Sequence, residues 1–312
     1  MIVHLPTITP PFLRPLPATS GVDAIAPQSS VSTSEIESLY ERIPAVVNRG
    51  KQNLLGVLVD AVDYEDVVAR ILGAARAGRP LSCTALAVHG VMSGVLDAQH
   101  RHRLNSLDVV TPDGQPVRWA LNWLHGVQLA DRVYGPKLMI ETCVRASEEN
   151  LRIYLYGAQP EVVSHLSQAL QDAVPGLEVA GAEPSRFRQL STGERSAMIG
   201  RIRDSGAAIT FVGLGCPRQE TFAYECAADL SMPVVAVGAA FDYHAGVRRE
   251  PSPRLQRLGL QWAYRLAQDP RRLWKRYLGL NTLYVVLLLL QRLRIWRPQE
   301  ATEAPTRPLR HG

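Results

Sequence analysis

An aspartate directly follows an apolar run in the segment "VVTPDGQPVRWAL", residues 109–121. Pro112 stiffens the chain before Asp113, and Gly114 after it permits a tight turn into a helix. A carboxylate at this point can act as general base for a hydroxyl group within hydrogen-bond reach. It can also cap the helix that follows, which is a common use of aspartate. The spacing alone favours the cap over catalysis.

A second candidate lies in "FVGLGCPRQE", residues 211–220, where a strand-like run ends in glycines before a helix. Gly213 and Gly215 leave backbone N–H groups open at the positive end of the helix dipole, which suits a diphosphate. The run lacks the third glycine of a dinucleotide fingerprint and the Gly-Lys-Ser/Thr of a P-loop, so a tight turn is an equal alternative. Gln219 and Glu220 stand in the first helical turn, where they meet a ligand or cap the helix.

Two further strand ends carry polar residues. "SCTALAVHG" contains Thr84, and "GAAFDYHAGVRREPSP" contains Asp242 and His244. A lone histidine beside one acid makes no catalytic triad without a nucleophile, and no G-x-S-x-G occurs. The chain also lacks a D-x-D pair that would hold Mg²⁺ or Mn²⁺ against a sugar-nucleotide diphosphate. We therefore expect no metal and no cofactor, and we expect arginines or backbone amides to neutralise any diphosphate.

Apolar runs and amphipathic segments of helical length alternate from Asn53 onward. Residues 53–78 indicate a strand and then a helix, and the near-continuous apolar runs that follow are typical of buried parallel strands. This pattern predicts an α/β fold with a Rossmann-like, largely parallel sheet and helices on both faces. Ligands bind beyond the carboxyl ends of such strands, which groups the candidates above along one edge. The expected strands are 81–88, 106–111, 151–157, 207–215 and 232–241.

Basic residues concentrate near the carboxyl end. The whole chain has a net charge of +5, whereas residues 248–297 contain twelve Arg or Lys and two acids. Within 258–280, aromatic and leucine side chains recur at helical spacing with arginines between them, which suits an anionic membrane surface. A solvated basic face on a packed helix is the alternative. The apolar run 280–290, with about 11 residues against the ~20 of a spanning helix, lies in a membrane interface or a protein core.

These patterns divide the chain into four parts. Residues 1–34 hold six prolines and form a flexible leader, 35–247 an α/β core, 248–297 a basic amphipathic appendage that associates with a membrane, and 298–312 a flexible tail.

No secretory signal is visible and the four cysteines are widely spaced, so we expect a cytoplasmic protein, peripheral on the inner face of the cell membrane. An apolar appendage surface would serve a homo-oligomer as readily as lipid, and no nucleic-acid motif is present.

Five ordered motifs resemble the WecG/TagA/CpsF family of bacterial glycosyltransferases, glycosyltransferase family 26. The resemblance covers roughly residues 53–280. The wording "AVHGVM" and "DGQPVRWALN" is most similar to members from exopolysaccharide gene clusters. The five motifs are "PDG" at 112–114, "DRVYGPKL" at 131–138, "GLGCPRQE" at 213–220, "VGAAFDYHAG" at 237–246 and "QWAYRLAQDPRRLWKRY" at 261–277.

The resemblance implies an inverting, metal-independent transfer of a sugar from a UDP-sugar donor to a polyprenyl-diphosphate-linked saccharide acceptor. By position, Asp113 resembles the proposed general base, which takes the proton of the acceptor hydroxyl group. The basic appendage resembles the one that closes over the active site at the membrane and supplies arginines to the diphosphate. The candidate substrate-binding residues are Thr84, Arg132, Gly213, Gly215, Gln219, Glu220, Asp242, Arg265, Arg272 and Arg276.

Two departures from the family pattern concern sugar specificity rather than reaction class. Leu86 stands where the family often has asparagine, and Gln261 stands where many members have glutamate. The donor sugar stays open between glucose, N-acetylmannosamine and its uronic acid. The alternatives in other function classes are a nucleotide-dependent oxidoreductase on the same sheet, against which the absent G-x-G-x-x-G counts, and a non-enzymatic basic membrane-binding protein.

Overall fold

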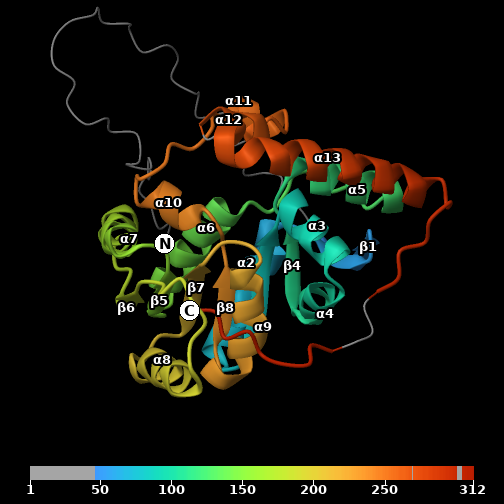
Figure 1. The fold of residues 1–312 in the computed structure, drawn as a ribbon. Coiled ribbons are helices and arrows are strands. Elements are labelled where there is room, and N and C mark those ends of the chain that lie inside the picture. Colours follow the sequence, from blue (N-terminus) through green and yellow to red (C-terminus); the bar gives the residue numbers. More distant parts are fainter. Residues whose placement is uncertain (1–45, 269, 301–303) are drawn as a thin grey trace, which may run out of the picture. The chain divides into compact units, whose positions relative to one another are not determined.

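The computed structural model describes residues 46–268, 270–300 and 304–312, without the side chains of 272, 273 and 275–278 (Figure 1). The predicted leader, 1–34, lies outside the described residues. The chain divides into two compact units, Met1–Val46 and Val47–Gly312, and every described helix and strand belongs to the second unit.

The second unit is built on a six-stranded sheet with the strand order β4-β3-β8-β7-β5-β6. All of its pairings are parallel. Every residue of β3, β4, β5 and β8 is buried, because helices cover both faces of the sheet. The predicted Rossmann-like parallel sheet is therefore confirmed. The strands are β3 Leu81–Leu86, β4 Val109–Pro112, β5 Ile153–Gly157, β6 Val179–Glu183, β7 Ile209–Gly213 and β8 Pro233–Ala236.

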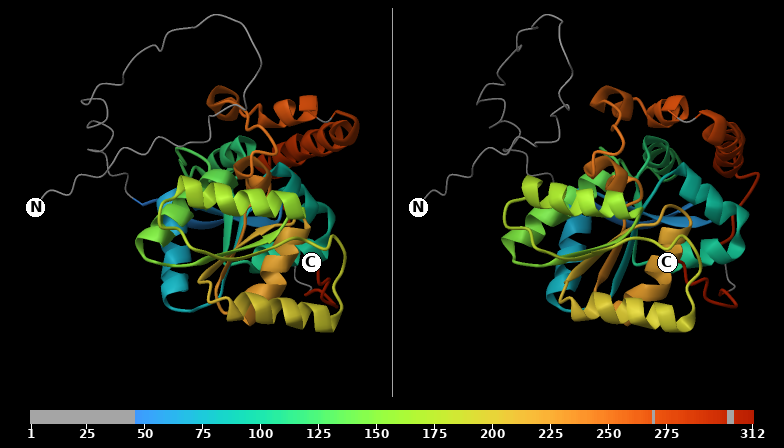
Figure 2. Two further views of the ribbon diagram at one scale, coloured as in Figure 1. Left: turned by 90° about the vertical axis from the view of Figure 1, so that its left-hand side faces the viewer. Right: turned by 60° about the vertical axis from the view of Figure 1, so that its left-hand side comes forward.

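Helices pack on both faces of the sheet (Figure 2). One apolar core includes residues of α3, α4, α5, α8 and α9, and the other includes residues of α2, α6, α7 and α10. In α7, for example, Val162, Val163, Leu166 and Leu170 recur at helical spacing and form the buried face. The helices are α2 Tyr64–Arg76, α3 Val88–Leu96, α4 Ala98–Ser106, α5 Gln115–His125, α6 Gly135–Glu148, α7 Pro160–Ala173, α8 Thr192–Asp204, α9 Arg218–Leu230 and α10 Ala240–His244.

The single strand predicted before α2 is instead an antiparallel hairpin of β1 Asn48–Leu54 and β2 Val57–Val62. Leu55 and Gly56 both adopt positive φ, at 58° and 91°, as a two-residue hairpin turn requires. The Asn53 side chain accepts the Gly56 N–H at 2.8 Å and closes the turn. The prediction missed β1 because its sequence, NRGKQNL, is polar and its first residues are exposed.

The predicted appendage folds as α11 Pro253–Arg257, α12 Gln261–Gln268 and α13 Pro270–Arg292. The apolar run 280–290 forms the second half of α13. Tyr284 is 3% exposed and donates its hydroxyl proton to the Pro116 carbonyl on α5 at 3.1 Å, so this side of α13 packs on protein. Val285 and Leu289 on the same helix are about half exposed, at 53% and 46%. None of the described helices combines the length and the apolarity that a bilayer-spanning helix needs.

The end of the predicted flexible tail, 298–312, is hydrogen-bonded to the core. The carboxylate of Glu225 on α9 accepts the backbone N–H groups of Leu309 and Arg310 at 2.7 and 3.0 Å. The Gly312 N–H donates to the Arg188 carbonyl at 3.2 Å. Residues 309–312 are thus held by hydrogen bonds to α9 and to the loop before α8, and the flexibility expected for 298–312 stays a prediction.

Parallel pairing brings the carboxyl ends of the strands to one edge of the sheet. Leu86 at the end of β3 is paired with Pro112 at the end of β4. Gly157 at the end of β5 is paired with Gly213 at the end of β7. The loops that carry Asp113 and the glycine segment therefore leave the sheet on the same side.

We predict that Tyr284 anchors the appendage. Tyr284→Ala should lower the free energy of unfolding by about 3–5 kcal/mol, because it empties a buried aromatic site. Tyr284→Phe should cost about 1 kcal/mol, since only the hydrogen bond to Pro116 is lost. Val285→Ala, at a half-exposed position of the same helix, is the control and should change stability by less than about 1 kcal/mol. Urea unfolding measures all three, and equal effects of the Tyr284→Ala and Val285→Ala variants would contradict the anchoring role.

Candidate active site

Asp113 occupies the edge between β4 and α5 without capping α5. The N-cap residue of α5 is Gly114, and no side chain makes the cap hydrogen bond there. The Asp113 backbone N–H donates to the Leu86 carbonyl at 3.2 Å, which fixes the loop to the end of β3. Its carboxylate accepts the Gly135 N–H at the start of α6. The reading as a cap of α5 is therefore wrong, and the carboxylate lies at the positive end of a different helix.

The surroundings of Asp113 change its acidity. Removal of the carboxyl group from water raises its pKa from 3.8 to about 6, although Arg132, Arg265 and the Gly135 N–H all favour the charged form. A base with a pKa near the working pH combines a useful deprotonated fraction with a sufficient affinity for a proton. A pKa near 6 is compatible with a general base, and the catalytic role of Asp113 stays a prediction.

Arg132 joins this loop to the appendage. Its side chain is buried, and one terminal nitrogen donates to the Asp113 carbonyl at 3.1 Å and to Gln261 Oε1 at 2.6 Å. The other donates to Gln256 Oε1 at 2.8 Å. The guanidinium also lies 4.2 Å from the centroid of the Tyr134 ring. The described hydrogen bonds of Arg132 therefore all go to protein acceptors, which lie on the loop after β4 and on α11 and α12.

Gln261 stands where many family members have glutamate, and its side-chain amide makes two hydrogen bonds of opposite direction. Its oxygen accepts from Arg132, while its Nε2 donates to the Tyr134 hydroxyl at 2.9 Å. A carboxylate at this position could accept from Arg132 but could not donate to Tyr134. The amide therefore serves two neighbours at once. Neither Gln256 nor the role of Tyr134 could be predicted from the residue pattern, because both depend on how the appendage packs against the core.

The glycines of the loop after β7 have different roles. A Cβ atom at Gly213 would lie 2.6 Å from the Phe241 ring, so this glycine is required for packing. Gly215 has a φ of +74° with open space beside it, which is a conformation that favours glycine. Its N–H donates to Gln219 Oε1 at 3.1 Å. One of the amides expected to bind a diphosphate is thus satisfied within the protein, and Gln219 is fixed by it.

Thr84, Gln219 and Glu220 meet in a buried hydrogen-bond network. Glu220 Oε1 accepts from Thr84 Oγ1 at 3.3 Å and from Gln219 Nε2 at 3.0 Å. All three side chains are at most 2% exposed. Burial raises the pKa of the Glu220 carboxyl group above its usual range. The network links Thr84 in β3 to the first turn of α9.

The remaining candidates are two residues of α10 and three arginines of the appendage. Asp242 on α10 pairs with Arg248 at 3.1 Å, and His244 lies 2.9 Å from the Pro136 carbonyl, so both make structural contacts. Arg265 on α12 lies close enough to Asp113 to lower its pKa. The side chains of Arg272 and Arg276 lie outside the described part of the structure.

We predict that the Asp113 carboxylate is a cost to stability at neutral pH. Because its folded pKa is raised, folding favours the protonated form, and stability falls as the pH rises from 3.8 through about 6. Asp113→Asn should therefore unfold with a free energy up to about 3 kcal/mol higher than the native chain at pH 8. The gain should vanish near pH 4, where the native carboxyl group is also neutral. Urea unfolding at both values tests this, and a loss of stability at pH 8 would contradict the raised pKa.

A comparison with known protein families bears on the whole arrangement. The family model described as "Glycosyl transferase WecG/TagA/CpsF family" matches residues 52–298. The matched residues include the six-stranded sheet, the strand ends with Asp113 and Gln219, and the three helices of the appendage. The chain belongs to the WecG/TagA/CpsF family of glycosyltransferases.

Proposed function

We propose that this glycosyltransferase moves a sugar from a UDP-sugar to a polyprenyl-diphosphate-linked saccharide, with inversion and without a divalent metal, in exopolysaccharide or other cell-surface polysaccharide biosynthesis. The observation that carries the proposal is the state of Asp113. Its carboxylate leaves α5 uncapped, accepts the Gly135 N–H, and has a pKa of about 6. These properties are those of a general base for a hydroxyl group.

The reaction is a single displacement. The acceptor hydroxyl group gives its proton to the Asp113 carboxylate, and its oxygen attacks the anomeric carbon of the donor sugar. A new C–O bond forms as the bond to the UDP β-phosphate oxygen breaks, and the electron pair leaves with UDP. Because the attack comes from the face opposite the leaving group, the anomeric configuration inverts. No covalent enzyme intermediate is formed.

Arginines of the appendage are proposed to neutralise the leaving diphosphate. Arg265 is close enough to Asp113 to affect its pKa, so its charge lies near the reacting centre. Arg272 and Arg276, whose side chains lie outside the described structure, are included because they stand four residues apart in the sequence of α13, the spacing typical of one helix face. Positive charge that is already in place where negative charge develops lowers the barrier without reorganisation.

Thr84, Gln219 and Glu220 are proposed to shape the donor pocket as one unit. Gln219 is held through Gly215 on one side and Glu220 on the other, so its amide has a fixed orientation. A fixed amide discriminates between sugar substituents better than a mobile one, because an unmatched buried group loses its hydrogen bond. The candidate donor sugars are glucose, N-acetylmannosamine and its uronic acid. Glucose would make the enzyme a hexosyltransferase, and N-acetylmannosamine would make it an N-acetylhexosaminyltransferase.

The appendage surface is proposed to bind the inner face of the cell membrane. Trp119 and Trp123 on α5, Trp262 on α12 and Trp274 on α13 are all 39% to 48% exposed. These helices gather at one end of the molecule (Figures 1 and 2). The Arg292 guanidinium lies 5.7 Å from the Trp123 ring centroid. Tryptophan beside arginine suits the headgroup region, where the ring meets apolar chains and the cation meets phosphate.

The central test is transfer by the full chain without added divalent cations. The purified protein is incubated with each labelled UDP-sugar and a polyprenyl-diphosphate-linked sugar, and the product linkage is read by NMR. We expect an inverted anomeric centre and a loss of about 10²–10⁴-fold in kcat for Asp113→Asn, the usual worth of a positioned base. The native activity should fall as the pH drops through about 6, since the base must be deprotonated.

Asp229→Asn is the control, because Asp229 is an exposed partner of Arg195 on the surface. It should keep the native activity. A retained anomeric configuration, or an Asp113→Asn variant as active as the control, would refute the proposed mechanism.

Membrane binding has its own prediction. The full chain should sediment with phosphatidylglycerol vesicles, and a Trp262→Ala/Trp274→Ala variant should bind about tenfold more weakly, since each exposed ring would bury apolar area in the interface. Phe187→Ala, which removes a 43% exposed ring from a loop of the core, serves as the control. If the Trp variant binds like the native chain but shows a smaller mass in ultracentrifugation, the surface is a subunit contact.

A further inference from the structure

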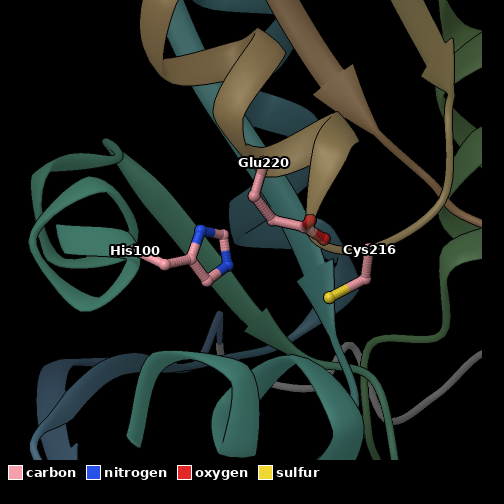
Figure 3. A group of neighbouring side chains, drawn as sticks. All are labelled: His100, Cys216 and Glu220. Carbon is pink, nitrogen blue, oxygen red and sulfur yellow. The ribbon is translucent and has the colours of Figure 1, made fainter. Parts of the chain in front are cut away.

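A cluster of three different ligand types lies on the α9 side of the sheet. His100 comes from α4, Cys216 from the loop between β7 and α9, and Glu220 from the first turn of α9. One nitrogen, sulfur or oxygen atom of each lies within 4.8 Å of those of the other two. Figure 3 shows the imidazole ring edge and the sulfur facing one another, with the carboxylate beside them. The proposed sugar transfer uses neither His100 nor Cys216.

Two atoms of this cluster are buried and unsatisfied. His100 is 3% exposed and Glu220 is 1% exposed. His100 Nε2 and Glu220 Oε2 have no hydrogen-bond partner among the residues that the structure describes. Such groups are rare in folded proteins because each loses its contacts with water without replacement. His100 Nε2 therefore needs a ligand from outside the described side chains, and the Cys216 sulfur and the Glu220 carboxylate lie close enough to share that ligand.

The surrounding side chains already orient the cluster. Thr84 and Gln219 both donate to Glu220 Oε1, so the unsatisfied Oε2 is the oxygen directed away from them. The Cys216 thiol lies 3.9 Å from Ser93 Oγ and also hydrogen-bonds to Glu220. Ordered outer contacts of this kind fix the ligands of metal sites and raise their affinity.

We propose that His100, Cys216 and Glu220 bind a zinc-like transition-metal ion. Imidazole, thiolate and carboxylate together select Zn²⁺ or a similar borderline-soft cation over Mg²⁺ or Ca²⁺, which prefer oxygen ligands. Binding forms a bond from the metal to each ligand atom, and the proton of the Cys216 thiol passes to the buffer. Water completes the coordination.

The charges around the cluster favour a divalent cation only if both Cys216 and Glu220 are anionic ligands. Arg103 is 2% exposed and lies on α4, one turn from His100, where its charge opposes a cation. A thiolate and a carboxylate contribute two negative charges and offset a dication, so both are needed. A monodentate imidazole with only one anionic ligand would leave the buried site with excess positive charge.

The role of this ion is structural. Its ligands join α4 to the β7–α9 loop, and Glu220 in turn holds Gln219 and Thr84. A site of imidazole and thiolate, buried on this side of the core, is chemically unsuited to bridge a sugar-nucleotide diphosphate as Mg²⁺ does. The inference therefore does not depend on the proposed transfer reaction, and it is compatible with transfer that needs no added Mg²⁺ or Mn²⁺.

Cobalt titration of the full chain under reducing conditions tests the proposal. We expect one Co²⁺ per chain, a thiolate-to-cobalt charge-transfer band, and displacement of that band by Zn²⁺. Cys216→Ser should abolish the band, and His100→Asn should weaken binding by at least the ~10-fold typical of outer contacts. Cys226→Ser is the matched control, because Cys226 is a buried thiol on α9 outside the cluster. It should behave like the native chain.

A second measurement covers the case in which a variant fails to fold. In the native chain, Zn²⁺ should slow alkylation of Cys216, read by mass spectrometry, and should raise the Tm by mass action. No band at one equivalent, a band retained in Cys216→Ser, or alkylation of Cys216 at the same rate with and without Zn²⁺ would each overturn the assignment.

Discussion

The buried guanidinium of Arg132 is the contact on which the rest of the site depends. It is held by the Asp113 carbonyl on the sheet edge and by Gln256 and Gln261 on the appendage. All three acceptors are neutral, so the charge is hydrogen-bonded without a salt bridge and remains available to influence the Asp113 carboxylate nearby. Hydrogen bonds to a buried charge contribute about 1.5–3 kcal/mol each, and their loss would weaken the attachment of α11 and α12 to the core.

Burial and the neighbouring charges shift the pKa of Asp113 in opposite directions. Burial raises the pKa of Asp113, while Arg132, Arg265 on the appendage and the Gly135 N–H at the α6 N-terminus limit the rise to about 6. A fully apolar surrounding would keep the carboxyl group protonated, and a strong salt bridge would make it a poor base. A loss of stability at this residue is what we expect if Asp113 is the proposed base, because catalytic sites commonly give up stability for reactivity.

Much of the fold could be predicted from residue patterns alone. Continuous branched apolar runs predicted β3, β4, β5, β7 and β8, because these strands are buried on both faces, and the amphipathic pattern in 53–78 predicted α2. β1 escaped notice because hydrogen bonds to β2, rather than apolar burial, hold it in place. β6, with the sequence VAGAE, is a partly exposed edge strand and has little apolar signal.

The site was only partly predictable, because some of its contacts join segments that lie far apart in the sequence. The sheet rule placed Asp113, Thr84 and Gln219 on one edge, since all three lie close to strand ends. It gave no partner for Arg132, because Gln256 and Gln261 lie more than 120 residues further along the chain. The pKa of Asp113, likewise, depends on burial by segments that are distant in sequence.

We propose that Asp113 is a base whose pKa is set by burial against two arginines and the Gly135 N–H. Its pKa can be measured directly by NMR titration of the side-chain carboxyl carbon in selectively ¹³C-labelled protein, with Asp113→Asn to assign the resonance. We expect a midpoint near 6. A midpoint at or below 3.8, the ordinary value for aspartate, would show that the carboxylate is committed to a structural contact and would contradict the account.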